Sequence, residues 1–277
     1  MRKTLALNGQ AGRVVEHAEP ETRQTAPRPT RVKLPRVLLS GMLLLVGWHA
    51  VVELGNIPRW LLPGPLVVWE RFGLAVADGT LRLHLVPTVI ESVGGFAVAL
   101  VVGAAMGYLV AHSRSLERWI APYLSALQSV PVIAVAPLLV VWTPNGFVRN
   151  ILVAALVVFF PIFASTVTGV RGVPRELREV ARVEGARRLQ MLRFVEVPLA
   201  LPTLLSGVRT SLAYATTGAV VAEFVGTRYG LGAMINIARG LLDIPLLFVA
   251  ILCLMGITLV FSIAVSLIER GLTSWRE

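Results

Sequence analysis

The sequence predicts an all-α, polytopic membrane protein with about six transmembrane helices. Of its 277 residues, 55% are hydrophobic and 15% are charged, and the mean hydropathy is +0.73, whereas ordinary soluble domains contain about a quarter charged residues. The apolar residues are gathered in runs of roughly 20, the length that a helix needs to cross a bilayer core. The basic residues lie beside these runs and not on a face with interleaved aromatic residues, which excludes nucleic acid as the expected partner of the net charge of +10.

The chain is expected to begin with a polar tail. Residues 1–35 are rich in Arg, Pro, Thr and Glu and lack an apolar period, which predicts a disordered cytoplasmic segment. The membrane domain is expected over residues 36–270, and residues 271–277 form a second cytoplasmic tail. Residues 36–53 are expected to form the first span, and a signal peptide is the competing interpretation. The long polar leader and the lack of a cleavage site after Ala50 favour an uncleaved helix.

Two helix-breaking prolines, Pro63 and Pro65, precede a stretch, WERFGLAVADG, that is typical of a short amphipathic helix at the interface. The second span, 85–111, is expected to pack closely against its neighbours because it contains four small residues, Gly94, Gly95, Gly103 and Gly107.

The third span, 119–142, is interrupted by prolines at 122, 131 and 137. The carbonyl groups that such breaks release are tolerated in a bilayer only where protein or a water-filled path satisfies them. Three further spans are expected at 150–170, 199–221 and 246–268.

Between the fourth and fifth spans lies a charged segment, 171–202, with seven Arg and four Glu residues. Pro174 suits the first turn of a helix, and Leu177, Val180 and Ala181 form a narrow apolar stripe that ends where Gly185 permits a bend. The segment therefore predicts two short helices outside the bilayer that can dock on a partner. The alternative is a helix lying on anionic lipid, which the interspersed Glu residues disfavour.

The basic residues also predict an orientation. With the N-terminus in the cytoplasm, 19 of the 26 Lys and Arg residues lie on the cytoplasmic side and 6 lie outside. The positive-inside rule therefore places both termini and the charged segment in the cytoplasm.

No energy source is visible in the chain itself. It lacks the G-x-x-x-x-G-K-[ST] loop that holds nucleotide phosphates, and its only lysines, Lys3 and Lys33, lie in the polar tail. Use of ATP would require a partner. The four histidines are isolated, and we expect no paired carboxylates within the spans that would form a proton relay.

A few polar residues in or near the spans are candidates for function. Glu91 and Arg209 either act in transport, snorkel, or are buried against other helices. The candidate pathway residues are Gln128, Ser129, Thr216, Thr217 and Glu223. Interhelical hydrogen bonding is the competing interpretation for the neutral ones.

The pattern EVARVEGA, followed by VPLALP at 197–202, resembles the Glu-Ala-Ala loop of permease subunits of binding-protein-dependent ABC importers. Three further stretches, LLPGPLVVWERF, PVIAVAPLLVVW and VVAEFVGTRYGLG, are similar to other parts of these permeases, most of all in the branch for nitrate, sulfonates, taurine, bicarbonate, and thiamine or riboflavin precursors. The resemblance implies the type I importer permease fold and a coupling loop at 171–198, with these ATPase-coupling positions: Glu179, Ala181, Gly185, Ala186, Pro198 and Pro202.

By this resemblance the chain is a non-catalytic subunit that needs no cofactor and forms the path of a small polar or anionic solute through the cell (inner) membrane. The implied partners are cytoplasmic ATP-binding subunits, a second permease copy and an extracytoplasmic solute-binding protein. An ATPase-independent channel, a proton-coupled carrier and a membrane-embedded enzyme remain the other classes. The sequence departs from the family mildly at Val180 and Val197, and more clearly at Pro144 and Glu91.

Overall fold

The computed structural model describes residues 34–58 and 60–273, so most of the expected tails, 1–33 and 274–277, lies outside it. The chain forms two compact units, one up to Leu45 and one from Val46 onward. The first contains the start of α1 (Leu34–Leu54). The second contains the remaining helices, which are α2 (Pro65–Ala77), α3 (Thr80–His112), α4 (Arg114–Ser129), α5 (Val132–Trp142), α6 (Gly146–Arg171), α7 (Arg175–Val183), α8 (Arg188–Met191), α9 (Val197–Phe224), α10 (Leu231–Gly240) and α11 (Ile244–Thr273).

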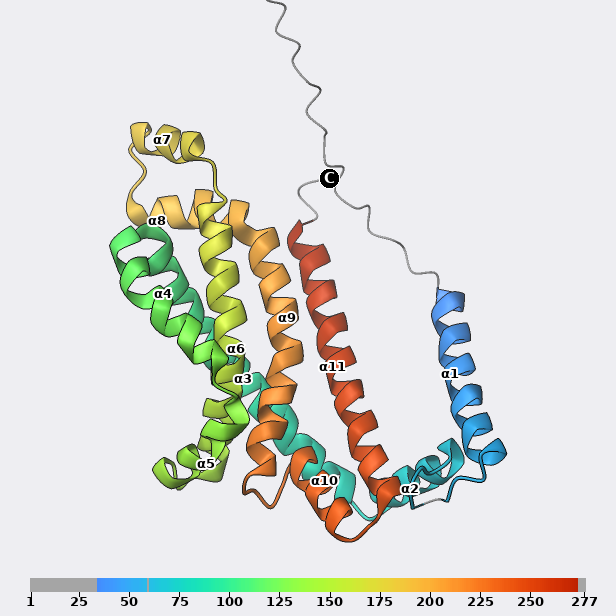
Figure 1. The fold of residues 1–277 in the computed structure, drawn as a ribbon. Coiled ribbons are helices and arrows are strands. Elements are labelled where there is room, and N and C mark those ends of the chain that lie inside the picture. Colours follow the sequence, from blue (N-terminus) through green and yellow to red (C-terminus); the bar gives the residue numbers. More distant parts are fainter. Residues whose placement is uncertain (1–33, 59, 274–277) are drawn as a thin grey trace, which may run out of the picture. The chain divides into compact units, whose positions relative to one another are not determined.

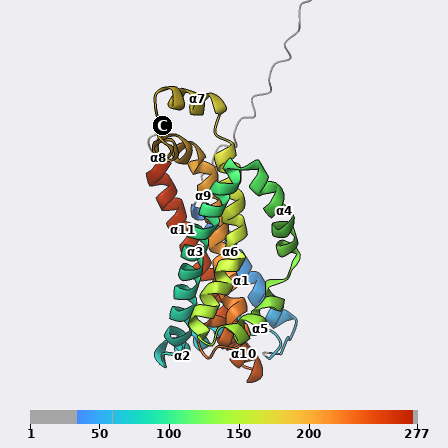
Figure 2. The ribbon, with the colours of Figure 1, turned by 90° about the vertical axis from the view of Figure 1, so that its left-hand side faces the viewer.

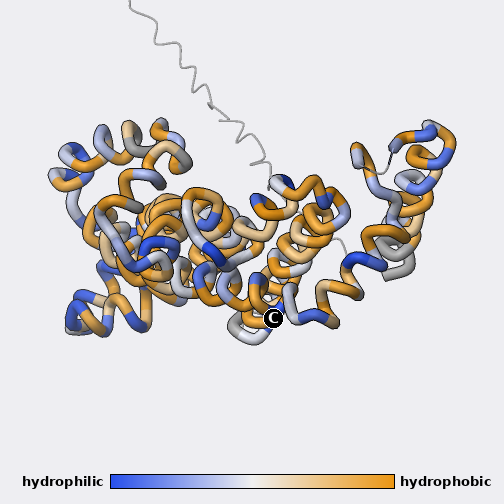
Figure 3. Tube along the Cα trace, turned by 90° about the horizontal axis from the view of Figure 1, so that it is seen from below, coloured by the Kyte–Doolittle hydropathy of each residue, from blue (hydrophilic) through white to orange (hydrophobic). Residues whose placement is uncertain are grey.

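Four helices of the described chain are long and apolar enough to cross a membrane. They cover Thr80–His112, Gly146–Arg171, Arg188–Phe224 and Ile244–Gly271, and a shorter apolar stretch covers Leu39–Leu54. Helices α3, α6, α9 and α11 run between an end that carries α7 and α8 and an end that carries α2 and α10 (Figure 1). Many large apolar side chains on these helices are exposed, as a lipid-facing surface requires. Hydrophobic residues predominate where the bundle is seen from below (Figure 3).

The third expected span is not one helix. It is divided into α4 and α5 at Val130 and Pro131, and α4 lies to one side of the α3–α6–α9 bundle (Figure 2). Proline removes a backbone donor and clashes with the preceding turn, so Pro131 ends one helix, whereas Pro122 and Pro137 lie inside α4 and α5.

Close packing of α3 on α6 depends on glycine. A Cβ atom at Gly95 would lie 2.5 Å from the Ala154 Cβ, and one at Gly107 would lie 2.8 Å from the Thr166 Cβ. The backbones of the two helices therefore approach closely, as small residues permit. Helix α6 in turn packs along α9, which places α6 at the centre of the bundle.

We expect Gly95→Ile to destabilise the bundle, because a branched side chain has no room against Ala154. Overpacking of this kind costs about 1–3 kcal/mol, so the melting temperature of the detergent-solubilised protein should fall. The matched control is Gly73→Ala in α2, where no atom lies within 4 Å of the added Cβ. An unchanged melting temperature for Gly95→Ile would contradict the close contact of α3 and α6.

The end of the bundle opposite α7 is held by polar contacts. The Asn145 side chain caps α6 by accepting from the Phe147 and Val148 N–H groups. Arg71 of α2 donates to Asp243 at 2.9 Å, and the same carboxylate accepts from the Leu246 N–H at the start of α11. These contacts fix the starts of α6 and α11 and join α2 to the start of α11.

Candidate functional site

The charged segment forms the expected pair of short helices. Helix α7 follows Pro174, and α8 begins after Arg187. Between them Gly185 has a φ of +82°, in the left-handed region that favours glycine. The Ala186 N–H donates to the Ala181 carbonyl and the Gly185 N–H to the Arg182 carbonyl, which together form a Schellman motif. The bend that the sequence predicts at Gly185 is therefore a defined helix end.

The surface of α7 is available to a partner. The stripe residues Leu177 and Val180 are exposed, and Val183 is 87% exposed. Glu179 is exposed as well, while Ala181 and Ala186 are half-buried. Exposed apolar side chains on a charged helix are typical of a protein-protein contact. Of the other two coupling positions, Pro198 lies in the first turn of α9 and Pro202 lies inside that helix.

One buried carboxylate attaches this segment to the bundle. Glu196 is 1% exposed, and its Oε1 lies 3.1 Å from the Arg178 Nε of α7 and 3.0 Å from the His112 Nε2 at the end of α3. The Arg178 contact is an ion pair by distance but is not aligned as a hydrogen bond. Arg178 also donates to the Val170 carbonyl of α6. Helices α3 and α7 thus meet at the carboxylate that precedes α9, and Arg178 extends the contact to α6.

Glu196 is the last residue of a π-helical turn, Leu192–Glu196, that leads into α9. Such turns are rare and occur often at functional sites. Sequence reasoning counted Glu196 only as one of four acidic residues of the segment. Its partners, Arg178 of α7 and His112 at the end of α3, lie outside its own turn, so no local pattern identified it.

A second ion pair holds α4 at the same end. Arg171 donates to both carboxylate oxygens of Glu117, at 2.6 and 2.8 Å. The hydrogen bonds from the Arg171 guanidinium hold the pKa of Glu117 below its usual range, because they stabilise the charged carboxylate. Bidentate pairs of this kind fix orientation as well as distance.

At the opposite end Glu223 anchors α10. Its Oε1 accepts from the Thr88 hydroxyl and its Oε2 from the Gly232 N–H, both at 2.6 Å, and the side chain is 1% exposed. The Leu231 N–H donates to the same Thr88 hydroxyl, so the N-terminus of α10 is held on α3. A side chain at Gly230, whose φ is +113°, would collide with the Glu223 carboxylate. The geometry assigns Glu223 an anchoring contact, and a pathway role stays a prediction.

The expectation that the spans contain no paired carboxylates was wrong. Glu91 of α3 and Glu223 of α9 are both buried, and Glu91 lies one turn from Thr88, whose hydroxyl binds Glu223. The Glu91 Oε1 accepts from the Asn150 amide of α6 at 2.9 Å. Arg149 is buried nearby and donates to the Gly226 carbonyl. The acidic residues come from spans that only the fold brings together.

The remaining polar candidates lie in separate places. Thr216 and Thr217 line a pocket of about 770 Å³ between α9 and α11, where Thr216 is buried and Thr217 exposed. Ser129 ends α4 at the break before α5, and the Gln128 side chain lies outside the described residues. Arg209 donates to Ser266 and Glu269 of α11, so it links two helices.

We expect Glu223→Leu to lower the melting temperature of the purified protein, because it leaves the Gly232 N–H buried without its acceptor and leaves the Thr88 hydroxyl only its longer hydrogen bond to the His84 carbonyl. Each such loss costs about 1–3 kcal/mol. Glu70→Leu, on the exposed face of α2, is the control. Equal melting temperatures for the two variants would show that α10 does not depend on Glu223.

Comparison with known proteins places this arrangement in a family. Residues 99–274 match the model of the binding-protein-dependent transport system inner membrane component. The chain is 52% identical over 234 residues to the riboflavin transport system permease protein RibX of Chloroflexus aurantiacus, covering 84% of this chain and 87% of that protein. It is 34% identical to the putative aliphatic sulfonates transport permease protein SsuC of Bacillus subtilis, covering 87% of each chain.

The fold has a solved counterpart. The described helices resemble a chain of the MetNI methionine ABC transporter in inward-facing conformations, with a TM-score of 0.60 and 20% identity, covering 71% of this chain and 99% of that one. That likeness concerns the fold, which is the type I importer permease fold predicted above. On the family match and the relatives together, the chain belongs to the inner-membrane permease subunits of binding-protein-dependent ABC transport systems.

Proposed function

We propose that this permease forms the membrane path of an ATP-driven importer whose cargo is a flavin-type vitamin. The observation that carries the proposal is the 52% identity to the permease named for riboflavin transport, against 34% for the aliphatic sulfonates permease and 30% for the taurine permease TauC of Escherichia coli. All three relatives cover more than four fifths of this chain. The closer similarity favours the vitamin over the anionic solutes that the sequence left open.

The proposal places the α7 end of the bundle in the cytoplasm, together with both termini, because most of the basic residues belong to that side. There α7 and the bend at Gly185 contact the ATP-binding subunit, with Glu179, Ala181 and Ala186 on the contact surface. The opposite end, with α10 and the Arg149 region, receives the solute from a binding protein. A second copy of this chain completes the path, and the chain itself does no covalent chemistry.

The mechanism follows from the attachment of α7. When the ATP-binding subunits close, they move α7, and the Arg178–Glu196–His112 contact passes that motion to α9 and α3. Helix α6 packs against both of these helices and moves with them. The permease thus shifts between two states whose populations depend on ATP.

The test is uptake by proteoliposomes that contain this permease, its ATP-binding subunit and its binding protein. Riboflavin should enter only when ATP is present on the side of the membrane that α7 faces. Excess taurine should not compete with riboflavin for uptake. Import of taurine or an alkylsulfonate without import of riboflavin would overturn the cargo assignment.

A proton-coupled carrier is the second candidate, and the burial of both Glu91 and Glu223 in one region favours it because buried acidic residues mark proton relays in transporters. In the same proteoliposomes a protonophore distinguishes the two. Uptake that continues under the protonophore with ATP held constant supports the ABC mechanism, and uptake that collapses supports the carrier.

A further inference from the structure

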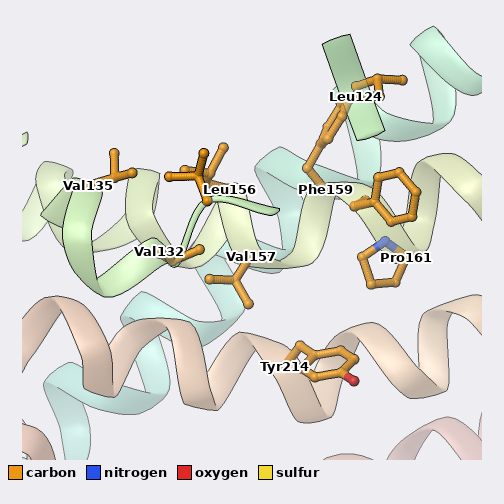
Figure 4. A pocket seen from close by; sticks show the side chains of 10 residues that line it. Leu124, Val132, Val135, Leu156, Val157, Phe159, Pro161 and Tyr214 are labelled. Carbon is orange, nitrogen blue, oxygen red and sulfur yellow. The ribbon is translucent and has the colours of Figure 1, made fainter. Parts of the chain in front are cut away.

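A pocket of about 430 Å³ lies beside the break between α4 and α5 (Figure 4). Four helices and the break contribute its walls, which are Leu124, Val130, Val132, Val135, Leu156, Val157, Phe159, Phe160, Pro161 and Tyr214. No charged side chain is among them. The volume falls within the range of about 300–1,000 Å³ that is usual for sites of small organic ligands.

The break itself points to a ligand. The last carbonyl groups of a helix have no N–H partner within that helix, and Pro131 supplies no N–H to the last turn of α4. The chain resumes helical bonding when the Ala134 N–H donates to the Pro131 carbonyl at 2.9 Å. Interrupted helices at membrane depth line cavities, and transporters place solute sites at such interruptions.

The walls select a flat and weakly polar molecule. Phe159 and Phe160 of α6 are half-buried, and Tyr214 of α9 is 48% exposed beside the pocket. Aromatic rings stack on other ring systems and gain more than the buried area alone provides. A small anion such as a sulfonate would lose its hydration in this pocket without gaining a charged partner.

We propose that this pocket is a transit site for the planar ring system of a heteroaromatic cargo, with Tyr214 as a specificity-determining residue. The inference rests on the proposed function, which supplies a flavin as the cargo. The ring system lies against Phe159, Phe160 and Tyr214.

The test uses the purified complex of permease and ATP-binding subunits without binding protein, with riboflavin as the probe. Stacking on tyrosine quenches flavin fluorescence, so the wild-type complex should quench it saturably. Tyr214→Leu should weaken binding about two- to tenfold, the loss of one aromatic contact. Tyr214→Trp should retain binding and confirm that the site tolerates substitution. The matched control is Tyr123→Leu, since Tyr123 lies on α4, is 72% exposed and does not line the pocket.

Three results would overturn the inference. The first is no saturable quenching by a wild-type complex that imports riboflavin, which leaves the proposed function standing. The second is an equal loss of affinity in Tyr123→Leu and Tyr214→Leu. The third is a Tyr214→Leu complex that binds riboflavin as tightly as the wild type but contains a different number of permease copies. That result would show that the pocket is a contact surface for the second permease copy. Failure of the cargo assignment is recognised separately, because the wild-type importer then takes up no riboflavin.

Discussion

Gly185→Asp is expected to abolish ATP-driven uptake while the permease remains inserted and folded. The residue has a left-handed backbone, and Asp tolerates that conformation better than most residues, at a cost of order 1 kcal/mol. Apart from its chain neighbours, no atom of residues 34–58 and 60–273 lies within 4 Å of an added Cβ. A large effect must therefore come from the partner that contacts the bend, and not from a clash within the permease.

Two further variants support this test. Glu179→Arg reverses a charge on the same exposed surface of α7 and should give the same loss of uptake. Gly79→Asp is the control and should transport normally, because Gly79 precedes α3, has a left-handed φ of +78° like Gly185, and has open space around an added Cβ. Uptake and ATPase association at wild-type levels in both Gly185→Asp and Glu179→Arg would exclude α7 as the coupling surface.

Glu196→Leu is expected to damage both stability and coupling. It leaves the partly buried Arg178 guanidinium without its counter-charge and removes the acceptor of His112. Breaking a buried pair by removing one partner costs about 3–5 kcal/mol, so the melting temperature should fall. ATP hydrolysis by the complex should also lose its dependence on the solute-loaded binding protein, because α7 is no longer joined to α9 and α3.

A double variant separates these two effects. Arg178→Leu combined with Glu196→Leu removes both charges, and replacing a buried pair with apolar residues is often neutral for stability. The melting temperature should recover relative to Glu196→Leu alone, while the coupling of ATP hydrolysis to transport stays impaired. Recovery of coupling together with stability would show that Glu196 serves only to hold the fold.

The long helices could be predicted from the sequence, and the contacts between them could not. Runs of apolar residues located α3, α6, α9 and α11 because length and hydropathy are local properties. Pro174 and Gly185 located the start and end of α7 because caps and bends depend on single residues. The orientation could also be predicted, because the positive-inside rule needs only the positions of Lys and Arg relative to the spans.

The polar sites were missed because their members are distant in the sequence. Glu91 and Glu223 belong to different spans, and their proximity depends on the packing of α3 near α9. Glu196 has partners on α3 and α7, and the coupling positions that the family resemblance implies do not include it. The break at Pro131 was visible as a proline, but the pocket beside it requires the positions of α6 and α9.

The central claim is that α7 contacts the ATP-binding subunit, and photo-crosslinking tests it most directly. The chain has a single cysteine, Cys253, so a Cys253→Ala background allows one cysteine to be introduced at Val183, which is 87% exposed on α7, and labelled with a benzophenone. In the complete importer this position should crosslink to the ATP-binding subunit, and a matched label at the exposed Leu241, at the opposite end, should not. Crosslinking of Leu241 to the ATP-binding subunit, with none from Val183, would contradict the account.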